Sequence, residues 1–296
     1  ENQNLPVFVT ISPSASTGGP RNYSNAFLPS IHQGTAIGRS GNVSGAKIKN
    51  IDNAMLSDAQ RENRFGLLQS LNRVQAGSSL DDNLEATISN YELAWRMQME
   101  APELTDLSKE TAATKSIYGI DEKYTDDFGK QCLLARRMVE RGVRFVSINY
   151  SDESANPRWD QHGNMPKHAD HARATDKPVA GLLQDLKARG LLEDTLVWWG
   201  GEFGRTPFSQ NKNGRDHNPR GFTVFLAGGG IKPGISYGAT DEIGGIAVDN
   251  RVHMHDLHAT ILYALGLDHE KLTYRYSGRD FRLTDVAGRV VYDLFS

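Results

Sequence analysis

TLVWWGGEFGRTP, residues 195–207, predicts the element around which the fold is arranged. Its apolar run Leu196–Trp199 is rich in strand formers and follows a helical pattern over residues 182–190, which indicates a βαβ crossover. We expect a parallel strand buried on both faces. Glu202 and Arg205 then follow the glycines that let the backbone turn, at the sheet edge where α/β proteins gather ligands. The alternative for these two charges is a salt bridge within the loop.

Composition limits the class of protein. The chain has 296 residues, 38% of them hydrophobic, which is enough to bury a large core. The net charge of −3 argues against a nucleic-acid partner, which would need a basic surface. The single cysteine, Cys132, excludes an intrachain disulfide. No apolar run is long enough to span a bilayer.

Apolar spacing predicts the other elements. We expect strands at residues 5–11, 143–150 and 222–227, and helices at 57–75, 80–100, 125–141 and 256–265. The first two helices should form a hairpin that turns at Ala76-Gly77-Ser78. Thr125 should cap the third helix, and Gly142 should end it. Residues 27–50 have no clear pattern, and the C-terminal tail is expected to be mostly irregular.

Carboxylates and imidazoles are concentrated in three loops next to predicted strands. The loop 159–164 carries Asp160 and His162, the 195–207 stretch carries Glu202, and the loop 215–219 carries Asp216 and His217. Such side chains are the ligands of a divalent cation. Because Asp216 and His217 are adjacent, we expect one to bind the cation and the other to orient it. His168 and His171 lie three residues apart on the next helix and face either this site or solvent.

Several phrases resemble one bacterial family, DUF1501, which is related to sulfatases in the alkaline phosphatase superfamily. These phrases are LPVFVTISP, GGPRNYSNAFLP, WDQHGN, GLLEDTLVWWGGEFGRTP, GRDHNP, FLAGGGIKPG, DLHATILYALGLDHE and YRYSGRDFRLTD. The resemblance implies an α/β fold of the alkaline phosphatase and sulfatase type, with a mostly parallel sheet and helices on both faces. It would form one domain over residues 1–296, truncated at its N-terminus, with a helical insertion at 54–121.

The resemblance also implies roles for single residues. WDQHGN supplies Asp160 and His162 as metal ligands, and His217 resembles the distant histidine of the same ion. Glu202 stands where the superfamily has the aspartate of a second site, but Phe203 replaces the histidine beside it and cannot bind metal. The nucleophile is expected in an upstream segment, because Cys132 lacks the sequence context that sulfatases modify. Export to the periplasm or outside the cell is expected by the same resemblance.

These features lead to three hypotheses. The first is a metal-dependent hydrolase of sulfate or phosphate esters that uses zinc, manganese or calcium. In it Arg205 binds the anionic group of a small ester or sulfated glycan, and Asp216 orients His217. The second is a catalytically degenerate relative that binds such a ligand without turnover. The third is an oligomeric scaffold with a vestigial site.

Overall fold

The computed structural model describes residues 4–15, 18–38, 56–76 and 82–296, which form two compact units. Unit 1 consists of Glu1–Trp159 and Asp170–Leu182, and unit 2 of Asp160–Ala169 and Leu183–Ser296. The long helix α5, His168–Ala188, therefore contributes residues to both units. The arrangement of a single domain over the whole chain stays a prediction.

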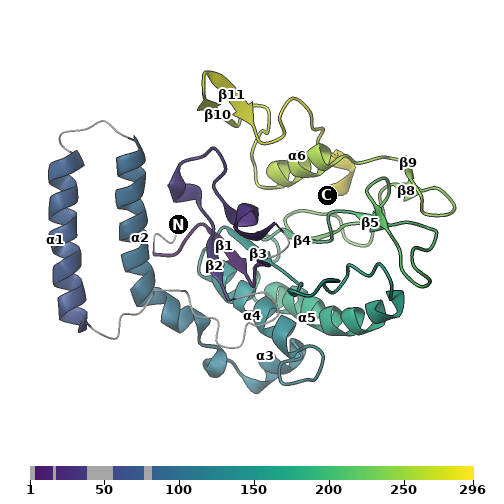
Figure 1. Ribbon diagram of the computed structural model, residues 1–296, viewed down its shortest axis with the longest axis horizontal. Coiled ribbons are helices and arrows are strands. Elements are labelled where there is room, and N and C mark those ends of the chain that lie inside the picture. The colour runs from purple at the N-terminus through teal and green to yellow at the C-terminus, as the bar shows by residue number, and fades with distance from the viewer. Residues whose placement is uncertain (1–3, 16–17, 39–55, 77–81) are drawn as a thin grey trace. The chain divides into compact units, whose positions relative to one another are not determined.

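Unit 1 contains a small parallel sheet (Figure 1). Its central strand β1, Phe8–Ile11, lies between β2, Thr35–Ile37, and β3, Phe145–Ile148. Both neighbours run parallel to β1, and Phe8 pairs with Phe145. The strands expected at 5–11 and 143–150 are confirmed in shortened form, and β2 lies in a region that the sequence pattern left unassigned. The described part of the chain thus contains both helices and strands, with a small parallel sheet in unit 1.

The core of unit 1 is formed where α4, Asp126–Glu140, packs against β3. Gly142 ends α4 with a φ of 86°, a conformation that costs glycine little. Thr125 occupies the N-cap position of α4 as expected, but its side chain makes no capping hydrogen bond, and its hydroxyl donates to the carbonyl of Gly119 at 2.5 Å. Cys132 is buried, and burial raises the pKa of its thiol, as expected for a core residue. The core cluster contains Leu5, Val9, Ile11, Ile37, Leu104, Leu134, Ala135, Met138 and Val143.

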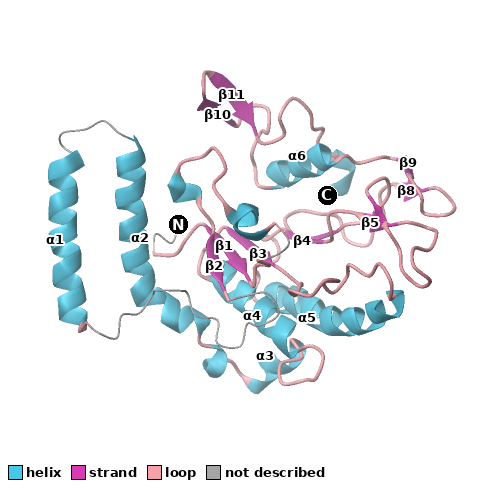
Figure 2. Cartoon of the chain, in the orientation of Figure 1, coloured by secondary structure: helices cyan, strands magenta, loops and turns pink. Residues whose placement is uncertain are grey.

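Two long helices form the expected hairpin in unit 1 (Figures 1 and 2). In it α1, Asp58–Ala76, packs against α2, Asp82–Thr105, and Phe65 stacks on Trp95 with ring centroids 4.8 Å apart. Gly77 and Ser78 of the predicted turn lie outside the described residues. A short helix, α3, Ala112–Ile117, follows. The expectation that residues 54–121 form an insertion into a larger domain stays a prediction.

The predicted central strand is present but differs in its pairing and its burial. In unit 2, β4, Val197–Trp199, pairs antiparallel with β7, Phe225–Ala227, in a two-stranded sheet. Trp198 is 39% exposed and Trp199 is 44% exposed. The expectation of a parallel strand covered on both faces is therefore wrong. An apolar run indicates a strand, but it does not identify the neighbouring strand or what covers its faces.

The rest of unit 2 consists of short elements joined by turns. The helix expected at 256–265 is confirmed as α6, Met254–Ala264, which begins earlier than expected. The tail that was expected to be mostly irregular contains an antiparallel hairpin of β10, Thr273–Tyr276, and β11, Arg279–Arg282. No helix in the described part of the chain is both long and apolar enough to cross a bilayer. The remaining strands are β5, Gly204–Arg205, β6, His217–Asn218, β8, Ala239–Thr240, and β9, Ala247–Asp249.

Candidate metal centre

Three segments of unit 2 bring their polar side chains together. The loop before the 3₁₀ turn Met165–Lys167 carries Asp160 and His162, while Arg205 and His217 come from two short paired strands. β5 and β6 are antiparallel, with Arg205 directly opposite His217. Directly opposed residues project from the same face of a sheet, so this register places both side chains on one side of the pair.

The side chains of Asp160, His162 and His217 converge on one point. The Asp160 Oδ1 atom lies 2.8 Å from His217 Nε2 and 3.0 Å from His162 Nε2. The two imidazole Nε2 atoms are themselves 3.0 Å apart. These three residues form a group whose ligand atoms could hold one metal ion. The sequence prediction that the Asp160 loop and the His217 loop meet is confirmed.

With both imidazoles neutral, a cation satisfies the contacts of this cluster better than hydrogen bonds do. The Nδ1 atom of His162 lies 2.8 Å from the Gln210 Oε1 atom, which can only accept, so this contact is a hydrogen bond when Nδ1 carries the proton. In the neutral ring the His162 Nε2 atom is then a bare acceptor that faces the Asp160 carboxylate. A neutral His217 contributes one Nε2 proton, which is too few for three mutual contacts. A divalent cation bound by all three atoms removes this repulsion.

Arg205 adds positive charge to the cluster. Its Nη2 atom donates to Asp160 Oδ1 at 2.7 Å, and its Nη1 atom donates to the carbonyl of Arg215 at 3.3 Å. Burial by itself would raise the pKa of Asp160. The hydrogen bonds from His217 and Arg205 outweigh burial and hold that pKa below its usual value. Asp160 is therefore ionised at neutral pH, as a metal ligand must be.

His217 is held by its neighbours on two sides. The Phe203 ring stacks on its imidazole, with centroids 3.9 Å apart and planes 26° apart. Asp216 accepts a hydrogen bond from the backbone N–H of His217 at 2.8 Å, and its Oδ1 atom lies 4.0 Å from His162 Nδ1. Asp216 thus contacts the main chain of His217 rather than its ring, and it also lies beside the ring of His162.

Comparison with known protein families identifies the chain at the family level. A family model described as "Protein of unknown function (DUF1501)" matches residues 1–295. The chain belongs to the DUF1501 family. No curated protein and no solved structure matches it.

Other predicted site residues of this DUF1501 chain lie outside the cluster. Glu202 is exposed and does not belong to the three-residue group, so its role as a ligand stays a prediction. His171 belongs to unit 1, where its Nδ1 atom lies 3.1 Å from the Tyr150 hydroxyl. His168 opens α5 and is half-buried. Neither histidine belongs to the metal-binding group.

Sequence reasoning missed Gln210 and the contact between Phe203 and His217. Gln210 lies in a segment whose polar composition resembles an ordinary surface loop, and an isolated glutamine there gives no motif. Phe203 was recognised only as a residue that cannot bind metal. The sequence did contain one signal, the glycine at position 214, since glycine allows two backbones to approach closely. In the structure a Cβ atom at Gly214 would lie 1.7 Å from the carbonyl oxygen of His162.

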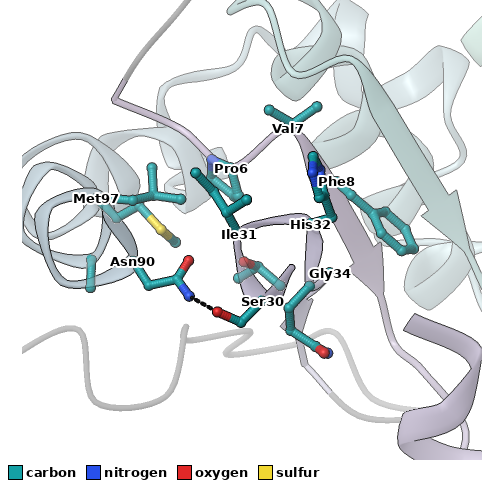
Figure 3. A pocket seen from close by; sticks show the side chains of 13 residues that line it. Pro6, Val7, Phe8, Ser30, Ile31, His32, Gly34, Asn90 and Met97 are labelled. Carbon is teal, nitrogen blue, oxygen red and sulfur yellow. Dashed lines mark hydrogen bonds between the residues drawn. The ribbon is translucent and has the colours of Figure 1, made fainter. Parts of the chain in front are cut away.

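Unit 1 of the DUF1501 chain contains a cavity of about 440 Å³ beside β1 and α2 (Figure 3). Asn90 donates to the Ser30 hydroxyl at 2.9 Å, and Met97 and Ile31 contribute apolar side chains to the lining. Its single titratable lining residue is His32. This cavity therefore lacks the group of acids and bases that the cluster in unit 2 provides.

Proposed function

We propose that this protein is a metal-dependent hydrolase of sulfate or phosphate esters, with one divalent cation bound by Asp160, His162 and His217. The convergence of these three ligand atoms within 3.0 Å of one another is the observation that carries the proposal. The ligands come from loops more than 50 residues apart in the chain. Such a convergence distinguishes a site from scattered surface polar groups.

The ligand chemistry favours zinc or manganese over calcium. Two imidazoles and one carboxylate suit zinc and other transition metals, whereas calcium takes six to eight oxygen ligands. Asp160 is the only oxygen ligand in the group of three. We therefore propose a transition-metal site and not a calcium site.

The protein's own side chains account for binding of an anionic substrate. When bound, the metal supplies Lewis-acid polarisation of an ester oxygen. Asp160 and the two imidazoles fix its position. Arg205 lies directly against the ligand carboxylate, so its guanidinium places positive charge where a sulfate or phosphate group would bind. Phe203 restrains the ring of His217, which keeps its Nε2 atom directed at the site.

The sequence phrases WDQHGN and GRDHNP support the same assignment, since they resemble the ligand loops of the alkaline phosphatase superfamily. That superfamily relation and an extracytoplasmic location belong to the proposal. A second cation at Glu202 lacks geometric support, because Glu202 is exposed and outside the group.

A second candidate function is binding without turnover. The observation that favours it is the packing of Phe203, which stacks on His217 at the position where a second-site histidine was expected. A site that holds one cation and lacks the imidazole of a second metal site can bind an anion through the cation and Arg205 without cleaving it.

Metal analysis and turnover together test the proposal. The purified protein is loaded with zinc or manganese, its metal content is measured, and hydrolysis of an aryl sulfate and an aryl phosphate is followed. We expect one bound ion per chain and turnover that a chelator abolishes. Metal binding without turnover of either ester supports the binding function, and absence of bound metal contradicts both.

A further inference from the structure

The contact between Gln210 and His162 links a loop to the choice of tautomer at the candidate metal centre. The Gln210 Oε1 atom and the His162 Nδ1 atom are 2.8 Å apart. An amide oxygen has no proton to give, so the pair forms a hydrogen bond only when Nδ1 is protonated. In the neutral imidazole this leaves Nε2 as the bare nitrogen.

The bare nitrogen of His162 faces the other two ligand atoms. His162 Nε2 lies 3.0 Å from Asp160 Oδ1 and 3.0 Å from His217 Nε2. Metals bind the unprotonated imidazole nitrogen, and the hydrogen bond at the opposite nitrogen fixes the tautomer and raises ligand basicity. The same Gln210 contact therefore both orients the ring and directs the lone pair toward the site.

The backbone holds Gln210 in place. Its N–H donates to the carbonyl of Gly214 at 2.9 Å, which closes a tight loop in which Asn211 and Lys212 have φ values of 45° and 59°. Two hydrogen bonds join this loop to the segment of His162: Met165 N–H donates to Asn213, and Arg215 N–H donates to Gln161. Gly214 allows the close approach, because any Cβ atom there would overlap the carbonyl of His162.

We propose that Gln210 is the positioning residue of the metal centre, which holds His162 in the Nδ1–H tautomer so that its Nε2 atom binds the cation. This inference rests on the proposed metal site and deepens it. The loop 210–214 then belongs to the site, although none of its residues is a ligand.

The test compares two variants of Gln210. Gln210→Met keeps the size of the side chain but removes the acceptor, and we expect zinc affinity to fall by about 10- to 100-fold. Gln210→Glu keeps an acceptor and should restore affinity to within about threefold of the native protein. Zinc affinity is measured by competition with a chelator, and circular dichroism confirms that each variant folds. Gln184→Met, an exposed position of α5, is the matched control and should leave affinity unchanged.

A second measurement separates this inference from the metal site itself. In metal-free protein, long-range ¹H–¹⁵N spectra report which nitrogen of His162 carries the proton, with the resonance assigned by a His162→Gln variant. We expect Nδ1–H in the native protein and in Gln210→Glu, and a shift toward Nε2–H in Gln210→Met.

The outcomes distinguish the two proposals. If the native protein binds zinc and Gln210→Met binds it equally well, the role of Gln210 is overturned and the metal site stands. If Gln210→Glu loses as much affinity as Gln210→Met, the hydrogen bond is not the cause and the inference is wrong. If no metal binds at all, the metal site fails, and with it the role of Gln210 in metal binding. The ¹⁵N spectra then show whether Gln210 still sets the tautomer.

Discussion

Two groups of paired polar side chains, one in each unit, are each built around a carboxylate but lie in different surroundings. In unit 1, Glu110 pairs with Arg136 at 2.9 Å and with Arg137 at 2.6 Å. In unit 2, Asp160 pairs with Arg205 at 2.7 Å and with His217 at 2.8 Å. The side chains of Arg136 and Glu110 are 2% and 9% exposed, whereas those of Asp160 and His217 are 31% and 39% exposed.

The surroundings indicate which group stabilises and which is available to a ligand. Arg137 also donates to the carbonyls of Leu104 and Glu103, so the unit 1 group ties α4 to the end of α2. The unit 2 group instead directs three ligand atoms at one another and remains open to solvent. Burial and ion pairing between packed elements indicate a structural role, while convergence of ligand atoms at a partly exposed position indicates binding.

The largest expected effect is on the buried group. Glu110→Ala removes the carboxylate that Arg136 and Arg137 share in the interior of unit 1. Arg136 keeps its pair with Glu140, and Arg137 keeps its two backbone carbonyls. We therefore expect the free energy of unfolding to fall by about 3 kcal/mol. Chemical denaturation measures this. The control is Glu122→Ala, which removes an exposed pair with Lys177 and should cost less than about 1 kcal/mol. Equal losses of unfolding free energy in the two variants would contradict a structural role for the buried group.

The lowered pKa of Glu110 determines the direction in which its contribution to stability changes with pH. Burial opposes ionisation of Glu110, but the hydrogen bond from Arg137 and the charge of Arg136 prevail and lower its pKa below the usual 4.5. A lowered carboxyl pKa stabilises the fold above the unfolded pKa, and this is lost as pH falls through the folded pKa. The difference in unfolding free energy between the native protein and Glu110→Gln should be constant above about pH 5 and shrink below it. A difference that grows on acidification would show the opposite sign.

In the unit 2 group, we expect substitution of Asp160 to weaken zinc binding and to change the stability of the protein little. Asp160→Asn removes the charged ligand, and we expect zinc affinity to fall by at least about 100-fold, or roughly 2.7 kcal/mol, with an unfolding free energy within about 1 kcal/mol of the native value. Chelator competition and denaturation measure the two quantities. Asp268→Asn, at an exposed aspartate of unit 2 outside the cluster, should alter neither zinc affinity nor stability. A large loss of stability in Asp160→Asn would make this group structural, like that of unit 1.

The smallest effect is expected at the loop that supports His162. Gly214→Ala places a methyl group against the carbonyl of His162, and the backbone shift should cost about 1–3 kcal/mol and weaken zinc binding. Gly163→Ala is the matched control in the same region, because a Cβ atom there meets nothing within 4 Å. Denaturation and chelator competition on both variants check this. Equal stability and equal zinc affinity in the two variants would show that the close approach of Gly214 to His162 contributes to neither property.

The two units also differ in how far the sequence predicted them. The helices α1, α2, α4 and α6 were found because their apolar residues repeat with the helical period, a local signal. The pairing of β4 was wrong, because pairing depends on a strand partner that no local pattern names. In the site, Asp160, His162 and His217 were found because their residue types suit a metal. Gln210 was missed because its role depends on the distance to a ring 48 residues away.

The buried thiol of α4 can report how often the core of unit 1 opens. Cys132 is the only cysteine of the chain and is 1% exposed, so a thiol reagent reaches it only when the surrounding core opens. The rate of labelling therefore follows the opening of unit 1 and is insensitive to opening confined to unit 2. Substitutions such as Glu110→Ala should accelerate the labelling, whereas zinc should leave it unchanged if the two units open independently.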